Sequence, residues 1–134
     1  MSTVLLDTNI VSYIFKRDTR AALYAPLLEG NRLVVSFVTV AELFEWAATR
    51  RWGAQRRVRL EQQLATYLII PVDVELCRIW GNLRSQRQAK GLTIAPQDAW
   101  IAATGLRHSL PLISHNPGDF RDIEGLEVHS IIVT

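Results

Sequence analysis

Three acidic residues occur where carboxylates can gather into one site. Asp7 directly follows a short apolar run, Glu42 follows a second apolar run at residues 33–38, and Asp98 lies just after Pro96, which opens an expected helix. The carboxyl ends of parallel strands form one edge of a sheet, and ligands bind in the crevice there. Crowded carboxylates repel one another unless a cation neutralises them, and all-oxygen ligands suit Mg²⁺ or Mn²⁺ rather than zinc.

Each of these acids also has a purely structural explanation. Asp7 has the position of an N-cap of the first helix. Glu42 stands three residues after Thr39, which is the spacing of a capping box. Asp98 in a first helical turn complements the helix dipole. The three explanations are independent, whereas one site accounts for all three positions together.

Strand-like and helix-like segments alternate along the chain and supply the frame for such a site. Alternation of this kind indicates an α/β fold, with a central, mostly parallel sheet of four to five strands covered by helices on both faces. No repeat or linker interrupts residues 1–134, so we expect a single domain. Strands are expected at 3–6, 33–38, 68–72, 112–114 and 128–133, with 68–72 of the buried type, and helices at 10–15, 21–29, 39–51, 54–66, 74–90 and 96–108.

The composition excludes several classes of protein. Of the 134 residues, 49% are hydrophobic and 21% are charged, which is incompatible with a disordered chain. The single cysteine, Cys77, excludes an internal disulfide and fits a reducing compartment, so a cytoplasmic location is expected. No apolar run approaches the roughly 18 residues of a membrane span, and the sequence has no glycine-rich phosphate-binding motif.

Positive charge is concentrated in the middle of the chain, although the net charge is only +2. The segments 46–72 and 76–97 are strongly basic, whereas the C-terminal segment is acidic. Basic helices can follow a phosphate backbone, but a basic stretch is also an ordinary solvated helix face. The residues that we single out as candidates for contact with a nucleic acid are Arg50, Arg51, Arg56, Arg57, Arg84 and Arg87.

Four segments, in order, resemble the motifs of PIN-domain ribonucleases, in particular the VapC toxins of bacterial toxin–antitoxin pairs. Order, spacing and total length all agree from residue 5 to residue 120. The four segments are Leu5-Leu6-Asp7-Thr8-Asn9, Ser36-Phe37-Val38-Thr39-Val40-Ala41-Glu42-Leu43, Pro96-Gln97-Asp98-Ala99-Trp100-Ile101-Ala102-Ala103-Thr104 and Ser114-His115-Asn116-Pro117-Gly118-Asp119-Phe120.

The resemblance implies a PIN-like fold and a Mg²⁺-dependent endoribonuclease, with Mn²⁺ as an alternative ion. Asp7, Glu42 and Asp98 would hold the metal, and Asn116, Asp119 or both would complete the site, because the family's fourth acid often falls at the position of Asn116. Cleavage would leave a 5′-phosphate and a 3′-hydroxyl. The expected partners are RNA, a VapB-like antitoxin and a second copy of the chain in a homodimer, with no membrane contact.

Three other hypotheses remain open from the sequence. A non-catalytic domain could bind RNA or protein through the same acidic pocket. A metal-free ribonuclease would need two histidines, and only His115 falls near the proposed site. Among the tryptophans, Trp52 is the best candidate for contact with RNA or a partner, while Trp46, Trp80 and Trp100 lie within helical stripes and are expected in the core or at an interface.

Overall fold

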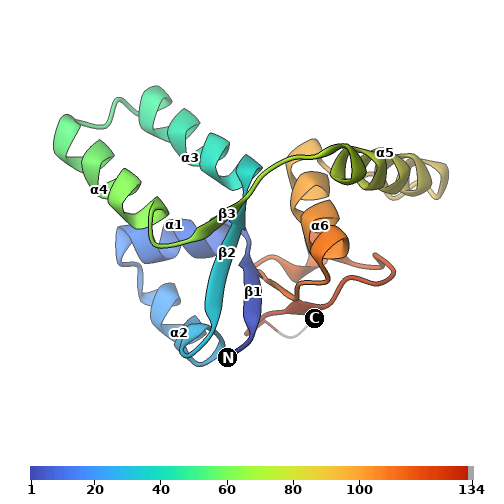
Figure 1. Ribbon diagram of the computed structural model, residues 1–134, viewed down its shortest axis with the longest axis horizontal. Coiled ribbons are helices and arrows are strands. Elements are labelled where there is room, and N and C mark those ends of the chain that lie inside the picture. Colours follow the sequence, from blue (N-terminus) through green and yellow to red (C-terminus); the bar gives the residue numbers. More distant parts are fainter. Residues whose placement is uncertain (133–134) are drawn as a thin grey trace.

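A parallel five-stranded sheet with strand order β3-β2-β1-β4-β5 runs through the middle of the computed structural model, which describes residues 1–132 (Figure 1). This confirms the predicted α/β fold. The elements, in chain order, are β1 (Thr3–Leu6), α1 (Thr8–Lys16), α2 (Thr19–Leu28), β2 (Arg32–Ser36), α3 (Phe37–Thr49), α4 (Ala54–Leu64), β3 (Leu68–Ile70), α5 (Val74–Ala89), α6 (Pro96–His108), β4 (Leu112–Ile113), the short 3-10 helix η1 (Pro117–Phe120) and β5 (Val128–His129).

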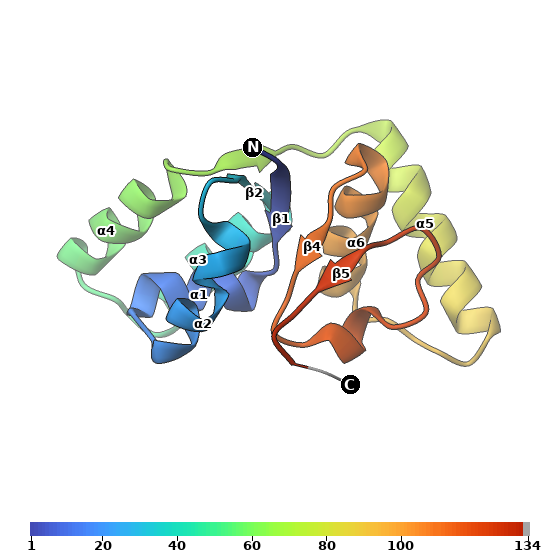
Figure 2. The ribbon, with the colours of Figure 1, turned by 90° about the horizontal axis from the view of Figure 1, so that it is seen from below.

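Helices cover both faces of the sheet, as Figure 2 shows, with α1 to α4 on one side and α5 and α6 on the other. Alternate residues of a strand point to opposite faces. In β1, Val4 and Leu6 pack in the core beneath α1 to α4, whereas Leu5 packs in the core beneath α5 and α6. In β2, Val35 packs in the core beneath α1 to α4, and Val34 packs in the core beneath α5 and α6. The strands are therefore apolar on both faces, which explains their continuous apolar runs in the sequence.

Two helices start directly at the carboxyl ends of the central strands. Asp7 ends β1 and caps α1, which confirms the predicted cap, and Ser36 ends β2 and caps α3 with a bond from the Val38 amide. The predicted capping box is wrong, because α3 begins at Phe37, and Thr39 and Glu42 lie inside the helix. An earlier helix start turns the Glu42 side chain away from the helix terminus and leaves it available for other contacts.

Some strand predictions differ from the structure. β3 is an edge strand with Leu68 51% and Ile69 41% exposed, so its prediction as a buried strand is wrong. The strand expected at 33–38 ends at Ser36, and the one expected at 128–133 covers Val128–His129, with residue 133 outside the described residues. Within residues 1–132, no helix is both long enough and apolar enough to cross a bilayer.

Candidate functional site

Asp7 is a buried carboxylate at the end of the central strand, with 5% of its surface exposed. Its Oδ1 accepts a bond from the Thr8 amide at 2.8 Å, and its Oδ2 accepts one from the Ser114 hydroxyl at 2.7 Å. Because β1 and β4 are neighbours, Ser114 at the end of β4 comes directly beside Asp7. The fold thus holds both carboxylate oxygens in fixed directions at the carboxyl edge of the sheet.

Glu42 is connected to the same edge through a pair of threonines. The Thr8 hydroxyl donates to Glu42 Oε1 at 3.0 Å and lies 2.8 Å from the hydroxyl of Thr39. Since the single Thr8 proton goes to Glu42, the Thr39 hydroxyl donates to Thr8. Thr39 is fully buried, so this chain of hydroxyls fixes the Glu42 side chain from inside the protein.

The structure places Asp98 and Asp119 within electrostatic reach of Asp7. Asp98 lies in the first turn of α6, as predicted, and Asp119 lies in η1 after β4. Burial raises the pKa of Asp7 to about 6, with hydrogen bonds from Ser114 and Thr8 opposing the increase and the charges of Glu42 and Asp119 adding to it. Burial, followed by the charges of Asp7 and Asp119, also raises the pKa of Asp98 to about 6.

The pKa of the Glu42 carboxyl is raised for similar reasons. Burial is the largest cause, the hydrogen bond from Thr8 opposes it, and the charges of Asp98 and Glu45 add to it. The carboxylates predicted from the sequence therefore influence one another electrostatically. None of Asp7, Glu42, Asp98 and Asp119 forms an ion pair with a Lys, Arg or His within residues 1–132.

The donor set fits a hard divalent cation, although its side chains do not form a closed cage. Across the described part of the chain, no three His, Cys, Asp or Glu side chains form a group that could hold a metal ion as they stand. Like charges that lack a counterion favour separated rotamers, and a cation would draw them together. The candidate donors are all oxygen atoms, from the carboxylates and the Asn116 side chain, which is the preference of Mg²⁺ and Mn²⁺.

Asn116 and Asp119 lie in one loop that is tied to the site by backbone contacts. The backbone amide of Asn116 donates to the Ser114 hydroxyl at 3.0 Å, and the side chain of Asn116 forms no capping hydrogen bond with η1. Beneath the loop, the hydroxyl of the fully buried Tyr24 lies 2.7 Å from His115 Nδ1 and donates to the Ser114 carbonyl at 3.3 Å. With Nδ1 engaged in this way, His115 acts as an anchor for the loop.

Sequence reasoning assigned no role to Thr8 and Ser114, and it gave Thr39 only the role of a helix cap. Thr8, Thr39 and Ser114 are all buried. Thr8 and Ser114 each donate to an acid, and Thr39 is hydrogen-bonded to Thr8. Their signal in the sequence was their position beside each candidate acid or strand end. Hydroxyl residues at such positions usually cap helices or form turns, which hides a role in positioning a side chain.

The six candidate arginines lie in different environments, and none of them forms an ion pair within residues 1–132. Three cover tryptophan rings: Arg56 lies 4.0 Å from the ring centre of Trp52, Arg50 lies 5.1 Å from that of Trp46, and Arg84 lies 5.3 Å from that of Trp80. Arg57 donates to the carbonyls of Trp52 and Ala47, Arg87 donates to the carbonyl of Arg121, and Arg51 is exposed.

Trp52 is buried rather than available for contact. Its exposed fraction is 8%, and its ring stacks on Phe15 with centroids 5.3 Å apart. Arg56 closes the outer side of this stack. The prediction of Trp52 as a contact residue is therefore wrong, because the ring belongs to the core beneath α1 to α4.

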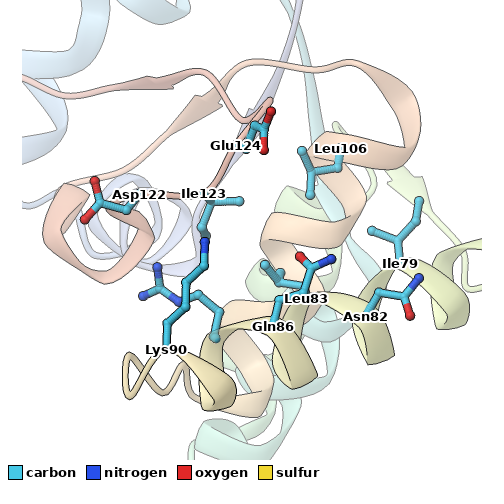
Figure 3. A pocket seen from close by; sticks show the side chains of 10 residues that line it. Ile79, Asn82, Leu83, Gln86, Lys90, Leu106, Asp122, Ile123 and Glu124 are labelled. Carbon is cyan, nitrogen blue, oxygen red and sulfur yellow. The ribbon is translucent and has the colours of Figure 1, made fainter.

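A separate pocket of about 260 Å³ lies between α5 and the segment after η1 (Figure 3). Its lining includes Arg87 of α5 and Lys90, which directly follows α5, together with Asp122, Glu124 and apolar side chains such as Leu83. Charges of both signs line it, and none of the candidate acids does. The pocket is therefore distinct from the carboxylate site.

The chain is similar in sequence to known proteins along most of its length. A sequence model of the PIN domain matches residues 4–126. Ribonuclease VapC1 of Haemophilus influenzae (strain R2866) is 30% identical over 125 residues, covering 92% of this chain and 93% of that protein. Toxin FitB of Neisseria gonorrhoeae is 32% identical over 125 residues, covering 87% of this chain and 90% of that protein.

Solved structures share the whole fold. In the crystal structure of VapBC2 from Rickettsia felis, bound to a DNA fragment from their promoter, one chain superposes with a TM-score of 0.85 at 25% identity. The match covers 98% of this chain and 100% of that one. All four predicted motif segments, which end at residue 120, fall inside the matched regions.

Proposed function

Because this chain belongs to the PIN-domain family, as a VapC-type member of it, we propose that it is a divalent-metal-dependent endoribonuclease and the toxin of a toxin–antitoxin pair. The observation that carries the proposal is a group of four carboxylates with which no basic residue among 1–132 pairs. Asp7 is buried, Glu42 and Asp98 are half-buried, and Asp119 is exposed. Unpaired carboxylates would repel a phosphate backbone unless a cation lay between them, so they do not suit a domain that only binds RNA.

The residues of the site take distinct roles. Asp7, Glu42 and Asp98 would hold Mg²⁺ or Mn²⁺, with Asp119 or Asn116 completing the set. When bound, the ion supplies an activated water and neutralises charge that develops on the phosphate. Ser114 and the Thr8 amide keep Asp7 oriented, and Thr8 and Thr39 keep Glu42 oriented. The protein itself provides no nucleophile.

Positive charge outside the site favours RNA as the substrate. Setting Asp7, Glu42, Asp98 and Asp119 aside as ligands leaves nine of the 13 Asp and Glu against 15 Lys and Arg. Exposed basic side chains on α4 and α5 are suited to contact the phosphate backbone on either side of the cut. Arg57 is the weakest of the candidates, because its guanidinium already donates to two backbone carbonyls.

Partners follow from the same family membership. The similar R. felis structure is of VapBC2, and the relatives of this chain include the toxin FitB. We expect a VapB-like antitoxin to bind this chain, two copies to associate as a homodimer, and the protein to act on RNA in the cytoplasm.

Cleavage of RNA should depend on a divalent ion. We expect the purified chain to degrade total cellular RNA in Mg²⁺ or Mn²⁺, to stop in EDTA, and to recover when the ion is restored in excess. The end groups should be a 5′-phosphate and a 3′-hydroxyl, which ligation assays distinguish. Cleavage that continues in EDTA would contradict the metal role, and RNA binding without cleavage in any divalent ion would favour the non-catalytic alternative.

The fourth ligand can be identified by a matched pair of substitutions in one loop. Asp119→Asn should lower the cleavage rate by about 10-fold or more, because it removes a charge that acts on both Asp7 and Asp98. Asn116→Ala should have the smaller effect, since the part of Asn116 tied to the site is its backbone amide. Single-turnover rates at several Mg²⁺ concentrations test this, and the reverse order of effects would assign the ligand to Asn116.

A further inference from the structure

A row of three aromatic side chains connects the start of α3 with α6 and α5. Trp100 of α6 packs edge-on against Phe37, the first residue of α3, with ring centroids 5.3 Å apart. On its other side, Trp100 stacks on Trp80 of α5, with centroids 4.6 Å apart and planes only 14° from parallel. All three rings are half-buried, so the row reaches the surface.

The outer end of the row is tied to the element that carries Asp98. The Trp80 indole N–H donates to the carbonyl of Pro96 at 3.2 Å, and Pro96 opens α6 two residues before Asp98. Trp80 therefore keeps a fixed position relative to the first turn of α6. A nucleotide next to a phosphate held at the carboxylates would therefore lie near the Trp80 ring.

The cation over Trp80 is loosely placed and has no acidic partner. Arg84 lies 5.3 Å from the ring centre, whereas Arg56 lies 4.0 Å from the ring of the buried Trp52. Arg84 forms no ion pair within residues 1–132, and the chain has no Asp or Glu between residues 76 and 97. Such a ring face, with a movable guanidinium above it and an excess of positive charge around it, suits an unpaired base and its phosphate.

We propose that Trp80 and Arg84 form a stacking subsite for an unpaired RNA base next to the phosphate that is cut. The base would lie on the outer face of Trp80, and Arg84 would swing outward to the adjoining phosphate. This inference rests on the proposed ribonuclease function and adds to it a place where single-stranded RNA is held. Base-paired RNA could not use the subsite, because its bases are already stacked.

The test measures RNA binding without cleavage. The probe is a fluorescein-labelled oligoadenylate in EDTA, titrated with the chain and followed by fluorescence anisotropy. Trp80→Leu keeps an apolar side chain against Trp100 but removes the stacking face, so it should weaken binding by about 5- to 100-fold. Trp80→Phe should restore most of the affinity.

The chain offers a matched control for this pair. Trp46 of α3 and Arg50, which caps the end of α3, have the same four-residue spacing and a similar ring-to-guanidinium distance of 5.1 Å, but Trp46 packs against the opposite core. Trp46→Leu should leave the affinity for oligoadenylate unchanged. Arg84→Gln should lower the slope of log affinity against log salt by about one, and Arg50→Gln should lower it less.

An abasic oligonucleotide separates stacking from phosphate contact. The wild-type chain should bind it about as weakly as Trp80→Leu binds oligoadenylate, and Trp80→Leu should cause no further loss. Equal affinity of the wild-type and Trp80→Leu chains for oligoadenylate would overturn the subsite, even if the wild-type chain cleaves RNA in Mg²⁺. Absence of both binding and cleavage in the wild-type chain would instead overturn the proposed function.

A protein contact at the same surface predicts a different result. If Trp80 belongs to an interface between two copies of this chain, Trp80→Leu will change the sedimentation coefficient and leave the affinity per protomer for oligoadenylate as it was. That outcome would also overturn the RNA subsite. Melting curves of both leucine variants in EDTA show whether each is folded, and Arg84→Gln repeats the binding test with no change to the packed rings.

Discussion

Asp7→Asn should lower the rate of RNA cleavage by about 100-fold or more while the protein stays folded. Replacing residues that only orient a metal ligand already costs 10- to 100-fold, and Asp7 would be a ligand itself. The amide keeps the shape of the side chain: its oxygen can accept from the Thr8 amide and its NH2 group can donate to the Ser114 hydroxyl, but it brings no charge. Single-turnover cleavage of labelled RNA in Mg²⁺ measures the loss.

The same substitution should make the metal-free protein more stable. The raised pKa of Asp7 means that its charged form is unfavourable in the folded state, so a neutral amide should add about 1–3 kcal/mol to the free energy of unfolding near pH 8. Asparagine caps a helix about as well as aspartate, so the cap of α1 is retained. Urea unfolding in EDTA gives this value.

Asp18 provides the control, since it is also an aspartate that caps a helix. It caps α2 through the Arg20 amide and pairs with the Arg20 side chain, which holds the pKa of Asp18 down at about 2. Asp18→Asn should therefore leave cleavage unchanged and should not stabilise the protein. If Asp7→Asn behaves as Asp18→Asn does, Asp7 is only a cap, and the metal site must be abandoned.

The sequence predicted the order of strands and helices well, because each element carries a local signal. Buried β-branched strands, a Pro at the start of α6 and turns at helix ends are all readable from neighbouring residues. The position of β3 at the edge of the sheet cannot be predicted in this way, since Leu68 and Ile69 are as apolar as residues of the central strands. Whether a strand lies at the edge depends on the order in which strands pair, and short-range patterns contain little of that information.

The candidate site also has a part that could be predicted from the sequence and a part that could not. Asp7, Glu42 and Asp98 were predicted from their places after strands and in first helical turns, and Asp119 from the family resemblance. The structure brings these four acids within electrostatic reach of one another. Their partners were not predicted. Thr8 reaches Glu42 across 34 positions of the sequence, and Ser114 reaches Asp7 across 107. Such contacts arise from the pairing of β1 with β2 and β4, which no local pattern records.

Stability without metal should fall as the pH rises through the pKa values of the site. The pKa of Asp7 is near its ordinary value of 3.8 in the unfolded chain and about 6 in the folded protein. Between these values the folded state binds more protons, so the free energy of unfolding decreases with rising pH. For Asp7 alone the decrease approaches about 3 kcal/mol between about pH 4 and pH 7, and Asp98, which is half-exposed, adds less in the same direction.

Other acids act in the opposite direction, but at lower pH. The pKa values of Asp18 and Asp73 are lowered by their hydrogen bonds and arginine partners, so the stability that they contribute is present above the unfolded value and is lost as the pH falls through the folded value. That loss occurs mainly below about pH 4. The metal-free chain should therefore be most stable near pH 5, below the pH at which the site carries its full charge.

A divalent ion should reverse this trend, because it binds the ionised carboxylates of the folded state only. In millimolar Mg²⁺ or Mn²⁺, urea midpoints should be higher at about pH 7.5 than in EDTA, and they should differ little between the two conditions at about pH 5, where protons compete with the ion. Asp7→Asn should flatten the pH dependence in EDTA and remove most of the response to metal, whereas Asp18→Asn should preserve both. A wild-type chain that gains stability from pH 5 to pH 7.5 in EDTA would show that the carboxylates are not held together as a charged group, and the proposed metal site would lose its physical basis.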